Sequence, residues 1–459
     1  MYQATTGSPL EPTDRLKPFL FLGNCVPARS PLLTTRRRVL QTLSSAGVVG
    51  SAGCVVGDGH ESDSPDETGT SAPDRWTELT LSSETTSTDD PEWRMLGHDT
   101  GNTFHNPHAE GPSDDPTVRW TVGGSTDTSF SGYVHHQPLI VDGTVYTTIE
   151  QAGTDDERWA FVAVDSDIGE TDPIFETDDP LWRPTIIDNT VYLAVGAAVA
   201  AYDLTDGTER WRTDPLRGEP SSIRRVDDVV VALIGTQLYD VSNGTLEPFP
   251  QLFVFDAETG ETLWEGPGDG SDADQPRLPI VADGGVLYPN TNSFRDLRTG
   301  EVLATLPSTH YPVLRDGEYY GSEDGGLVSY DWETMSPRWE YRPADRVIGG
   351  GWASVAGDIV ILDDVRGPGF VGLDRTTGER LWTTELWEEG LGTIFWASTE
   401  TTVYTAHDGG AAAALDVADG TVRWRINTDE MEWGLGSGCA LADDLWVTVG
   451  RDHTLFTLS

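Results

Sequence analysis

The chain has 459 residues, of which 76 are acidic and 29 basic, so its net charge at pH 7 is -47. A surface this acidic repels phosphate backbones and anionic lipid headgroups, which excludes nucleic-acid binding and electrostatic membrane docking. Apolar residues make up 37% of the chain and include 16 tryptophans, which indicates a folded protein rather than an acidic disordered polymer.

Lys17 is the only lysine, so the remaining basic residues are arginines. This charge balance resembles that of proteins from halophilic archaea, where carboxylates keep the surface hydrated and salt screens their repulsion. The alternative is an acidic face that binds a partner. Of the three cysteines, Cys25 lies upstream of a predicted cleavage point and Cys54 at it, which leaves Cys439 alone and predicts no disulfide.

The N-terminal region carries an export signal. Residues 35–41, Thr-Arg-Arg-Arg-Val-Leu-Gln, resemble the twin-arginine motif through Arg36, Arg37 and Arg38. The apolar run that follows is about 15 residues long, too short for a membrane-spanning helix. It ends in Ser-Ala-Gly-Cys54, which resembles a lipobox, so we predict that Cys54 carries a lipid and anchors the protein to the outer face of the cytoplasmic membrane. The alternative is a chance arginine run before an ordinary helix.

The segments on either side of this signal differ in composition. Residues 1–34 contain five prolines and no period, and we interpret them as an extension from a misplaced start codon. The signal peptide then covers 35–53. Residues 54–90 are rich in Ser, Thr, Asp and Pro, which predicts a flexible acidic tether. Asn243 begins a glycosylation sequon.

Two sequence phrases alternate from residue 138 onward, at intervals of roughly 35 to 55 residues, the period of propeller blades. The first phrase is a proline, apolar residues and an Asp-Gly or Asp-Asn pair, which predicts a β-hairpin because these residues accept the positive φ of a tight turn. It begins at Pro138, Pro184, Pro279 and Pro312, with weaker copies near Ile223, Ala353, Ala397 and Cys439.

The second phrase is an apolar run followed by Asp, three residues, Gly, three residues and Trp. Complete copies are Asp203/Gly207/Trp211, Asp256/Gly260/Trp264, Asp374/Gly378/Trp382 and Asp416/Gly420/Trp424. Incomplete copies are Asp331/Trp339, which lacks the Gly, and two in which Ala304 or Pro173 replaces Trp. The last copy stops at Ser459, and residues 118–122, Val-Arg-Trp-Thr-Val, resemble its missing outer strand. We therefore predict an all-β fold, an eight-bladed β-propeller of four-stranded antiparallel blades over 91–459, with the strand at about 118–122 completing the last blade.

The repeated Asp-x3-Gly-x3-Trp pattern resembles the repeat of the pyrroloquinoline quinone (PQQ) family of propellers. Residues 93–102, Trp-Arg-Met-Leu-Gly-His-Asp-Thr-Gly-Asn, resemble the segment that often precedes the first blade of that family. The resemblance implies that the repeated tryptophans dock on the neighbouring blade, and a large ring at a fixed place in each unit leads to the same expectation. These structural tryptophans are Trp120, Trp211, Trp264, Trp339, Trp382 and Trp424.

Ligands of propellers usually meet residues at the start of the innermost strands, around the central channel. The two positions before the proline position vary from blade to blade, as expected where a ligand sets the residue. The predicted ligand-binding residues are His136, Arg183, Arg277, His310, Tyr311, Trp352 and Trp396. A planar acid would lie between the two tryptophans with its carboxylates on the two arginines. The alternative is that these residues fill the channel and pair with nearby acids.

A catalytic quinoprotein of this family would need adjacent cysteines, a calcium site and an aspartate base, and the sequence has no Cys-Cys pair. His98, His105 and His108 lie in a loop-like segment, and we predict neither a metal site nor catalytic residues. Our first hypothesis is a monomeric, non-catalytic surface scaffold that binds envelope proteins. The second is a PQQ-dependent or other quinone-type oxidoreductase, with PQQ and calcium as cofactors.

Overall fold

The computed structural model describes residues 90–123, 132–134, 137–151, 158–234, 251–266, 278–288, 292–307, 310–323, 325–343, 353–364, 369–386, 393–407, 411–427, 438–449 and 454–459. All of them belong to one compact unit. The export arginines Arg36, Arg37 and Arg38, the lipid site Cys54 and the sequon at Asn243 lie outside the described residues. Every helix or strand within the described ranges is a β-strand, and none of them contains a helix that could cross a membrane.

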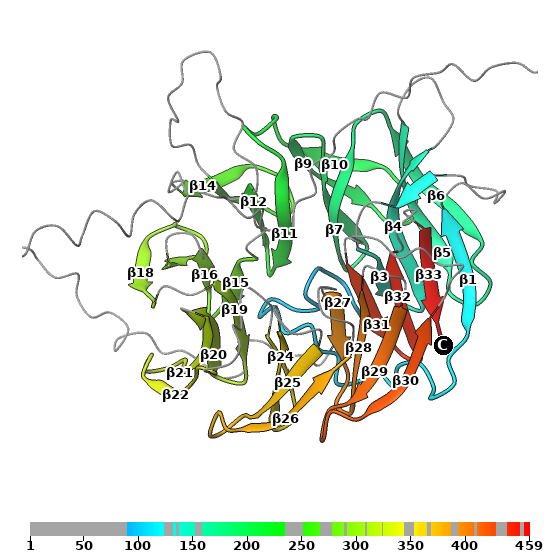
Figure 1. Ribbon diagram of the computed structural model, residues 1–459. Helices are drawn as coiled ribbons and strands as arrows, with labels where there is room; N and C mark the ends of the chain where they lie inside the picture. Colours follow the sequence, from blue (N-terminus) through cyan, green and yellow to red (C-terminus); the bar gives the residue numbers. More distant parts are fainter. Residues whose placement is uncertain are drawn as a thin grey trace, which may run out of the picture. The chain divides into compact units, whose positions relative to one another are not determined.

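The strands form eight antiparallel sheets, which we number as blades 1 to 8 in chain order (Figure 1). Blade 1 contains β3 (Leu139–Val141), β4 (Thr144–Gln151), β5 (Arg158–Asp165) and β6 (Thr171–Thr177), and β2 (Gly132–Val134) pairs with the far end of β4. Blade 2 contains β7 (Leu181–Ile187), β8 (Thr190–Val195), β9 (Ala198–Asp203) and β10 (Glu209–Arg212). Blade 3 contains β11 (Pro220–Val226), β12 (Val229–Ile234), β13 (Leu252–Asp256) and β14 (Thr262–Gly266).

The next four sheets repeat this pattern. Blade 4 contains β15 (Ile280–Ala282), β16 (Gly285–Tyr288), β17 (Ser293–Asp296) and β18 (Val302–Thr305). Blade 5 contains β19 (His310–Arg315), β20 (Glu318–Glu323), β21 (Gly326–Asp331) and β22 (Pro337–Tyr341). Blade 6 contains β23 (Ala353–Ala356), β24 (Ile359–Asp364), β25 (Gly369–Asp374) and β26 (Arg380–Glu385). Blade 7 contains β27 (Thr393–Ser398), β28 (Thr402–His407), β29 (Ala411–Asp416) and β30 (Val422–Asn427).

Blade 8 is assembled from both ends of the described chain. It contains β31 (Cys439–Ala442), β32 (Leu445–Val449) and β33 (Thr454–Leu458), and its outer strand is β1 (Val118–Gly123). In the β1–β33 ladder Trp120 lies opposite Thr457, and Val122 opposite Leu455. The predicted fold, eight blades with an N-terminal strand in the last one, is therefore confirmed.

The first strand of each blade is the innermost one. First strands of neighbouring blades contact each other around the ring, including β3 with β7, β27 with β31, and β31 with β3. Because β31 belongs to the last blade and β3 to the first, these contacts close the circle. The turns after the first strands have the predicted geometry, since Asp142 and Gly143 take φ values of 49° and 68°.

The conserved spacing of the second phrase has a steric cause. Five of the six outer-strand tryptophans lie against the Asp-x3-Gly turn of the following blade, and the indole N–H of each donates to a carbonyl of that turn. The donor and acceptor pairs are Trp120 with Ser166, Trp211 with Ala257, Trp264 with Leu297, Trp339 with Arg375, and Trp382 with Val417. A Cβ added at Gly378 would lie 2.5 Å from the Trp339 ring. Glycine therefore makes room for the indole, and Trp424, which is also buried, packs beside Tyr404.

Two blade interfaces lack this tryptophan and use other aromatic residues. Where Pro173 replaces it, Phe175 stacks on Tyr202 of blade 2 with ring centroids 4.0 Å apart. Where Ala304 replaces it, Trp332 of blade 5 donates to Asp283 of blade 4. The sequence pattern did not predict these contacts, because the substituting rings stand outside the repeated position.

Candidate functional site: the ring axis

Residues 91–106, which we call the axial segment, run along the inner edges of the blades. An innermost strand has unpaired backbone groups on its inner side, and this segment bonds to them. In blade 1, Trp93 exchanges two backbone hydrogen bonds with Ile140, of 2.9 and 3.0 Å. The other backbone partners are Arg94 with Ile186, Thr100 with Val281, Gly101 with Leu314, and Phe104 and Asn106 with Ser398.

The axial segment reaches the remaining neighbours through side chains. The Asn106 amide donates to the carbonyl of Leu441 in blade 8 at 2.9 Å. Most of the bonded innermost-strand residues stand two positions after the proline position of their blade, so most of the segment lies at this level of the ring. At that level the protein's own chain occupies the axis (Figure 1). The Asn102 amide reaches further, to the carbonyls of Leu278 and Pro312.

Arg224 of blade 3 holds the middle of the axial segment. Its guanidinium donates to the carbonyls of Leu96 and Asp99 at 2.9 and 2.7 Å, and also to the Asn102 side chain. The side chain is 1% exposed, and its removal from water lowers the pKa of Arg224 to about 10. It stays protonated at neutral pH, so a buried charge is balanced here by carbonyl dipoles.

A serine, a histidine and a glutamate meet further along the segment. His105 Nδ1 lies 2.9 Å from Ser398 Oγ, and its Nε2 lies 3.3 Å from Glu400. These residue types resemble a hydrolytic triad, but His105 and Ser398 are both fully buried and Ser398 Oγ also bonds to Ser354. A substrate carbonyl has no approach to such a hydroxyl. Removal from water lowers the pKa of His105 to about 4, so the ring is neutral at pH 7 and this cluster holds the segment in place.

The three histidines near the start of the domain do not form a metal site in the described structure. His98 is buried beside Trp93, His105 is bonded as above, and His108 is exposed. Across the described ranges, no group of three or more His, Cys, Asp or Glu side chains could hold a metal ion. Within these ranges, therefore, no set of such side chains would hold the calcium ion of a quinoprotein enzyme.

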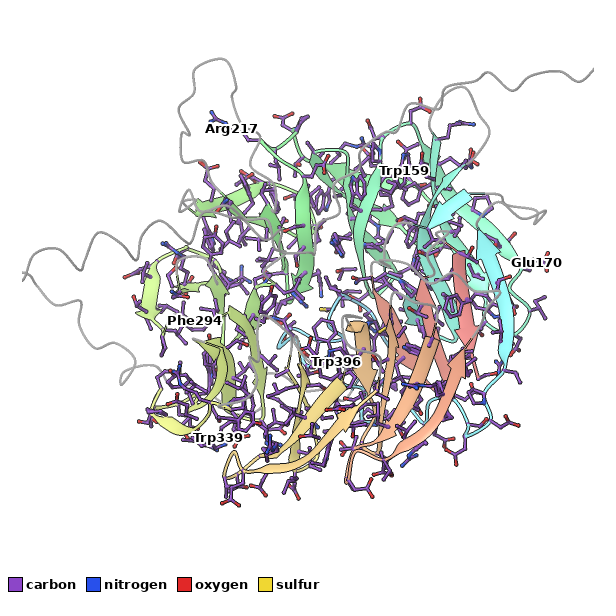
Figure 2. All side chains as sticks on the ribbon, in the orientation of Figure 1. Trp159, Glu170, Arg217, Phe294, Trp339 and Trp396 are labelled. Atoms are coloured by element: carbon purple, nitrogen blue, oxygen red, sulfur yellow. The ribbon has the colours of Figure 1, made fainter. Side chains whose placement is uncertain are left out.

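The predicted ligand-binding residues are described only in part. His136, Arg277 and Trp352 lie outside the described residues, and for His310 only the backbone is described. Trp396 is 5% exposed and packs edge-on against Phe370 of blade 6, with ring centroids 5.4 Å apart. Figure 2 shows Trp396 nearer the middle of the ring than Trp339. Its ring is thus part of a blade interface rather than a free stacking surface.

Arg183 and Tyr311 share an unusual backbone geometry. Each precedes the proline of its innermost strand, and the ladder is irregular there, between Trp182 and Thr185 and between His310 and Val313. Their φ values are 52° and 50°, although a residue before proline is normally extended. Such strain costs of order 1–3 kcal/mol and occurs mainly at functional positions, where a bulge redirects a side chain.

The environment of Arg183 differs from that of the other enclosed arginines. It keeps part of its surface accessible, and its enclosure by protein lowers the pKa of Arg183 to about 10. Among the described residues no hydrogen-bond acceptor or carboxylate contacts its guanidinium. A guanidinium held in this way could bind a carboxylate, and PQQ carries carboxylates.

Eight antiparallel sheets, seven of four strands and one of five, around an occupied axis define this molecule as an eight-bladed β-propeller. Residues 367–459 match the family model described as outer membrane protein assembly factor BamB. In its repeats and its fold the chain is similar to the PQQ-like β-propellers. No curated protein sequence matches it.

Solved structures of several kinds share the fold. BamB from Moraxella catarrhalis is 16% identical, with a TM-score of 0.52 over 75% of this chain and 100% of that one. A europium-containing methanol dehydrogenase is 12% identical, with a TM-score of 0.55 over 81% and 90%. The computationally designed Ika8 protein is 14% identical, with a TM-score of 0.54 over 73% and 98%. At these identities the similarity shows a shared fold, and function has to be argued from the site.

Proposed function

We propose that this protein is a non-catalytic scaffold, exported by the twin-arginine route and held on the outer face of the cytoplasmic membrane by a lipid on Cys54, where it binds envelope or surface proteins. The observation that carries this proposal is the axial segment. Because residues 91–106 occupy the axis and bond to the innermost strands, the surfaces left for partners are the blade ends and their loops.

Two further features support the scaffold. The matched family model describes an assembly factor, which is a protein that acts on other proteins. The sequence has no Cys-Cys pair of the kind that the quinoprotein enzymes use. The strongly acidic composition agrees with a surface that works in multimolar salt, and it argues against a nucleic-acid partner.

The second candidate is a PQQ-dependent or other quinone-type oxidoreductase. One observation favours it: Arg183, near the leading end of an innermost strand, keeps part of its surface accessible and has no acid beside its guanidinium in the described residues. Arg183 would hold a carboxylate of the cofactor, and the quinone would supply the two-electron chemistry.

The test compares the wild type with Cys54→Ser in cells grown in high salt. Chemical cross-linking of the membrane fraction is expected to yield one defined protein partner for the wild type. Cys54→Ser should move the propeller into the medium and remove that partner. The purified protein is also titrated with PQQ and calcium in multimolar KCl, while dye reduction with alcohols and sugars is followed. Saturable binding with turnover would overturn the scaffold proposal in favour of the oxidoreductase.

A further inference from the structure

The residues just before the proline position of the innermost strands fall into two groups, buried and partly accessible. Most of its described members are buried, namely Gln137, Ser222, Leu278, Trp396 and Gly438. Arg183 of blade 2 and Tyr311 of blade 5 keep accessible surface, and these are the two non-glycine members with positive φ. Positive φ therefore coincides with exposure, whereas the ladder irregularities of blades 3 and 7 adjoin the buried Ser222 and Trp396. A bulge with positive φ can turn a side chain off the blade face and toward the axis.

The composition does not explain why Arg183 has no counter-ion among the described residues. The chain has 76 acidic residues, and arginines elsewhere in the ring form ion pairs with some of them. Arg210, Arg338 and Arg423, which precede the docking tryptophans, donate to the turn aspartates Asp203, Asp331 and Asp416 at 2.6 to 2.7 Å. A guanidinium that has no acid beside it among the described residues, and that is held by a strained backbone, is suited to an anion from outside.

Gln137 occupies the same position as Arg183 on the adjacent blade. It is 0% exposed, and neither its amide nitrogen nor its amide oxygen has a hydrogen-bond partner in the part of the chain that the structure describes. Leaving a buried amide unpaired costs about 1–3 kcal/mol. A Cβ added at Gly438 would lie 2.5 Å from the Gln137 Cβ, so the glycine of blade 8 leaves the room that Gln137 fills. One donor and one acceptor on a primary amide match the C=O and N–H of a peptide bond.

The axial segment limits how a ligand can reach these two residues. It bonds mostly to residues two positions after the proline, and the Asn102 side chain also donates to the carbonyls of Leu278 and Pro312. Gln137 and Arg183 stand one position before the proline, at the leading ends of their strands. A polypeptide coming from the leading ends of the innermost strands meets the segment and cannot pass through. Only a chain end fits this geometry, and the end that carries a negative charge is the carboxyl terminus.

We infer that Arg183 and Gln137 form a binding site for the carboxyl terminus of a polypeptide, with the guanidinium on the terminal carboxylate and the Gln137 amide on the last peptide group. Tyr311, across the axis, would contact the terminal side chain. The inference gives the proposed scaffold a partner chemistry, but it rests on these residues and is tested apart from the scaffold function.

The test uses the full-length protein and a fluorescein-labelled Gly-Ala-Phe peptide, as the free acid and as the carboxyl-terminal amide, in multimolar KCl. Fluorescence polarisation should show saturable binding of the acid, with the amide weaker by about 10- to 100-fold, the loss expected for one charge-assisted hydrogen bond. Arg183→Gln should weaken the acid by a similar factor. The matched control is Arg217→Gln, which changes the net charge by the same amount. Arg217 is exposed at the outer edge of the ring (Figure 2).

A second variant separates binding from a structural role. Asparagine tolerates positive φ, so Arg183→Asn should leave the unfolding midpoint unchanged or raised while peptide binding is lost. Equal binding of acid and amide, unchanged binding by Arg183→Gln, or complete displacement of the peptide by an equal concentration of inorganic phosphate would each overturn the inference. PQQ binding that depends on Arg183 in the absence of peptide binding would also overturn it, and would identify a different ligand. The scaffold proposal fails separately, in the cross-linking experiment.

Discussion

The Trp-on-Gly contact between blades gives a prediction that can be separated from ordinary turn strain. Gly378 and Gly143 both have positive φ, 72° and 68°, so alanine at either position has the same backbone penalty of about 1–2 kcal/mol. A Cβ at Gly143 meets nothing within 4 Å, whereas a Cβ at Gly378 meets the Trp339 ring at 2.5 Å. Overpacking of this kind adds about 1–3 kcal/mol. We therefore expect Gly143→Ala to lower the free energy of unfolding by about 1–2 kcal/mol and Gly378→Ala by about 2–5 kcal/mol.

The measurement is urea unfolding followed by circular dichroism in constant high salt, with Trp339→Ala as a third background. Removing the indole is itself costly, by about 3–5 kcal/mol, because it leaves a cavity. In that background, however, Gly378→Ala should lose its steric component and cost no more than Gly143→Ala does. Equal destabilisation by the two glycine substitutions in the intact protein would refute the proposed steric role, and so would an undiminished effect of Gly378→Ala in the Trp339→Ala background.

Two further predictions concern the irregular blade interface and the axial segment. Ala304 stands in the tryptophan position of blade 4, and Met335 of blade 5, with φ 50°, stands where other blades have the glycine. Ala304→Trp alone should destabilise the protein by about 1–3 kcal/mol in urea unfolding, and adding Met335→Gly should recover most of that loss. A double variant as unstable as Ala304→Trp alone would contradict the pairing of these two positions. The pKa of His105 is ordinarily 6.5 and falls to about 4 in the folded protein. Between these two pH values His105 binds a proton only in the unfolded chain, so the free energy of unfolding should fall as the pH is lowered through this window. His105→Gln should remove about 3 kcal/mol of that dependence, and a wild-type pH profile in the variant would exclude this role.

The ring could be predicted from the sequence because equivalent residues make the same turn and the same packing contact in most blades. Each Asp-Gly pair makes a hairpin turn and each outer-strand tryptophan fills the gap between blades, so the same letters recur at the same spacing. Even the last blade followed from this rule, since the strand that carries Trp120 supplies the outer strand that β31–β33 lack. The substitutes Phe175 and Trp332 escaped prediction because each solves a local packing problem from another position.

The axial segment could not be predicted in detail, for a different reason. Its contacts are made largely by backbone N–H and C=O groups, which every residue carries, so the sequence shows no pattern for them. Arg224 gave no distinct signal either, because its strand also contains Ser221, Ser222 and Arg225. At the candidate site the sequence indicated Arg183 and Tyr311, while the bulges, the buried amide of Gln137 and the packing of Trp396 against Phe370 required the structure.

The two ends of the innermost strands are consequently not equivalent. At the turn end, Glu92 accepts a hydrogen bond from the Asp142 backbone at 2.8 Å, and Asp90 pairs with Arg94. The chain therefore joins the propeller beside the first hairpin turn of blade 1. On the proposed anchoring, the tether at 54–90 attaches on this side, and the leading ends with Arg183 and Gln137 lie on the other side of the axial segment. A partner whose carboxyl terminus reaches those residues would approach the side away from the attachment point, where the tether does not compete for the same space.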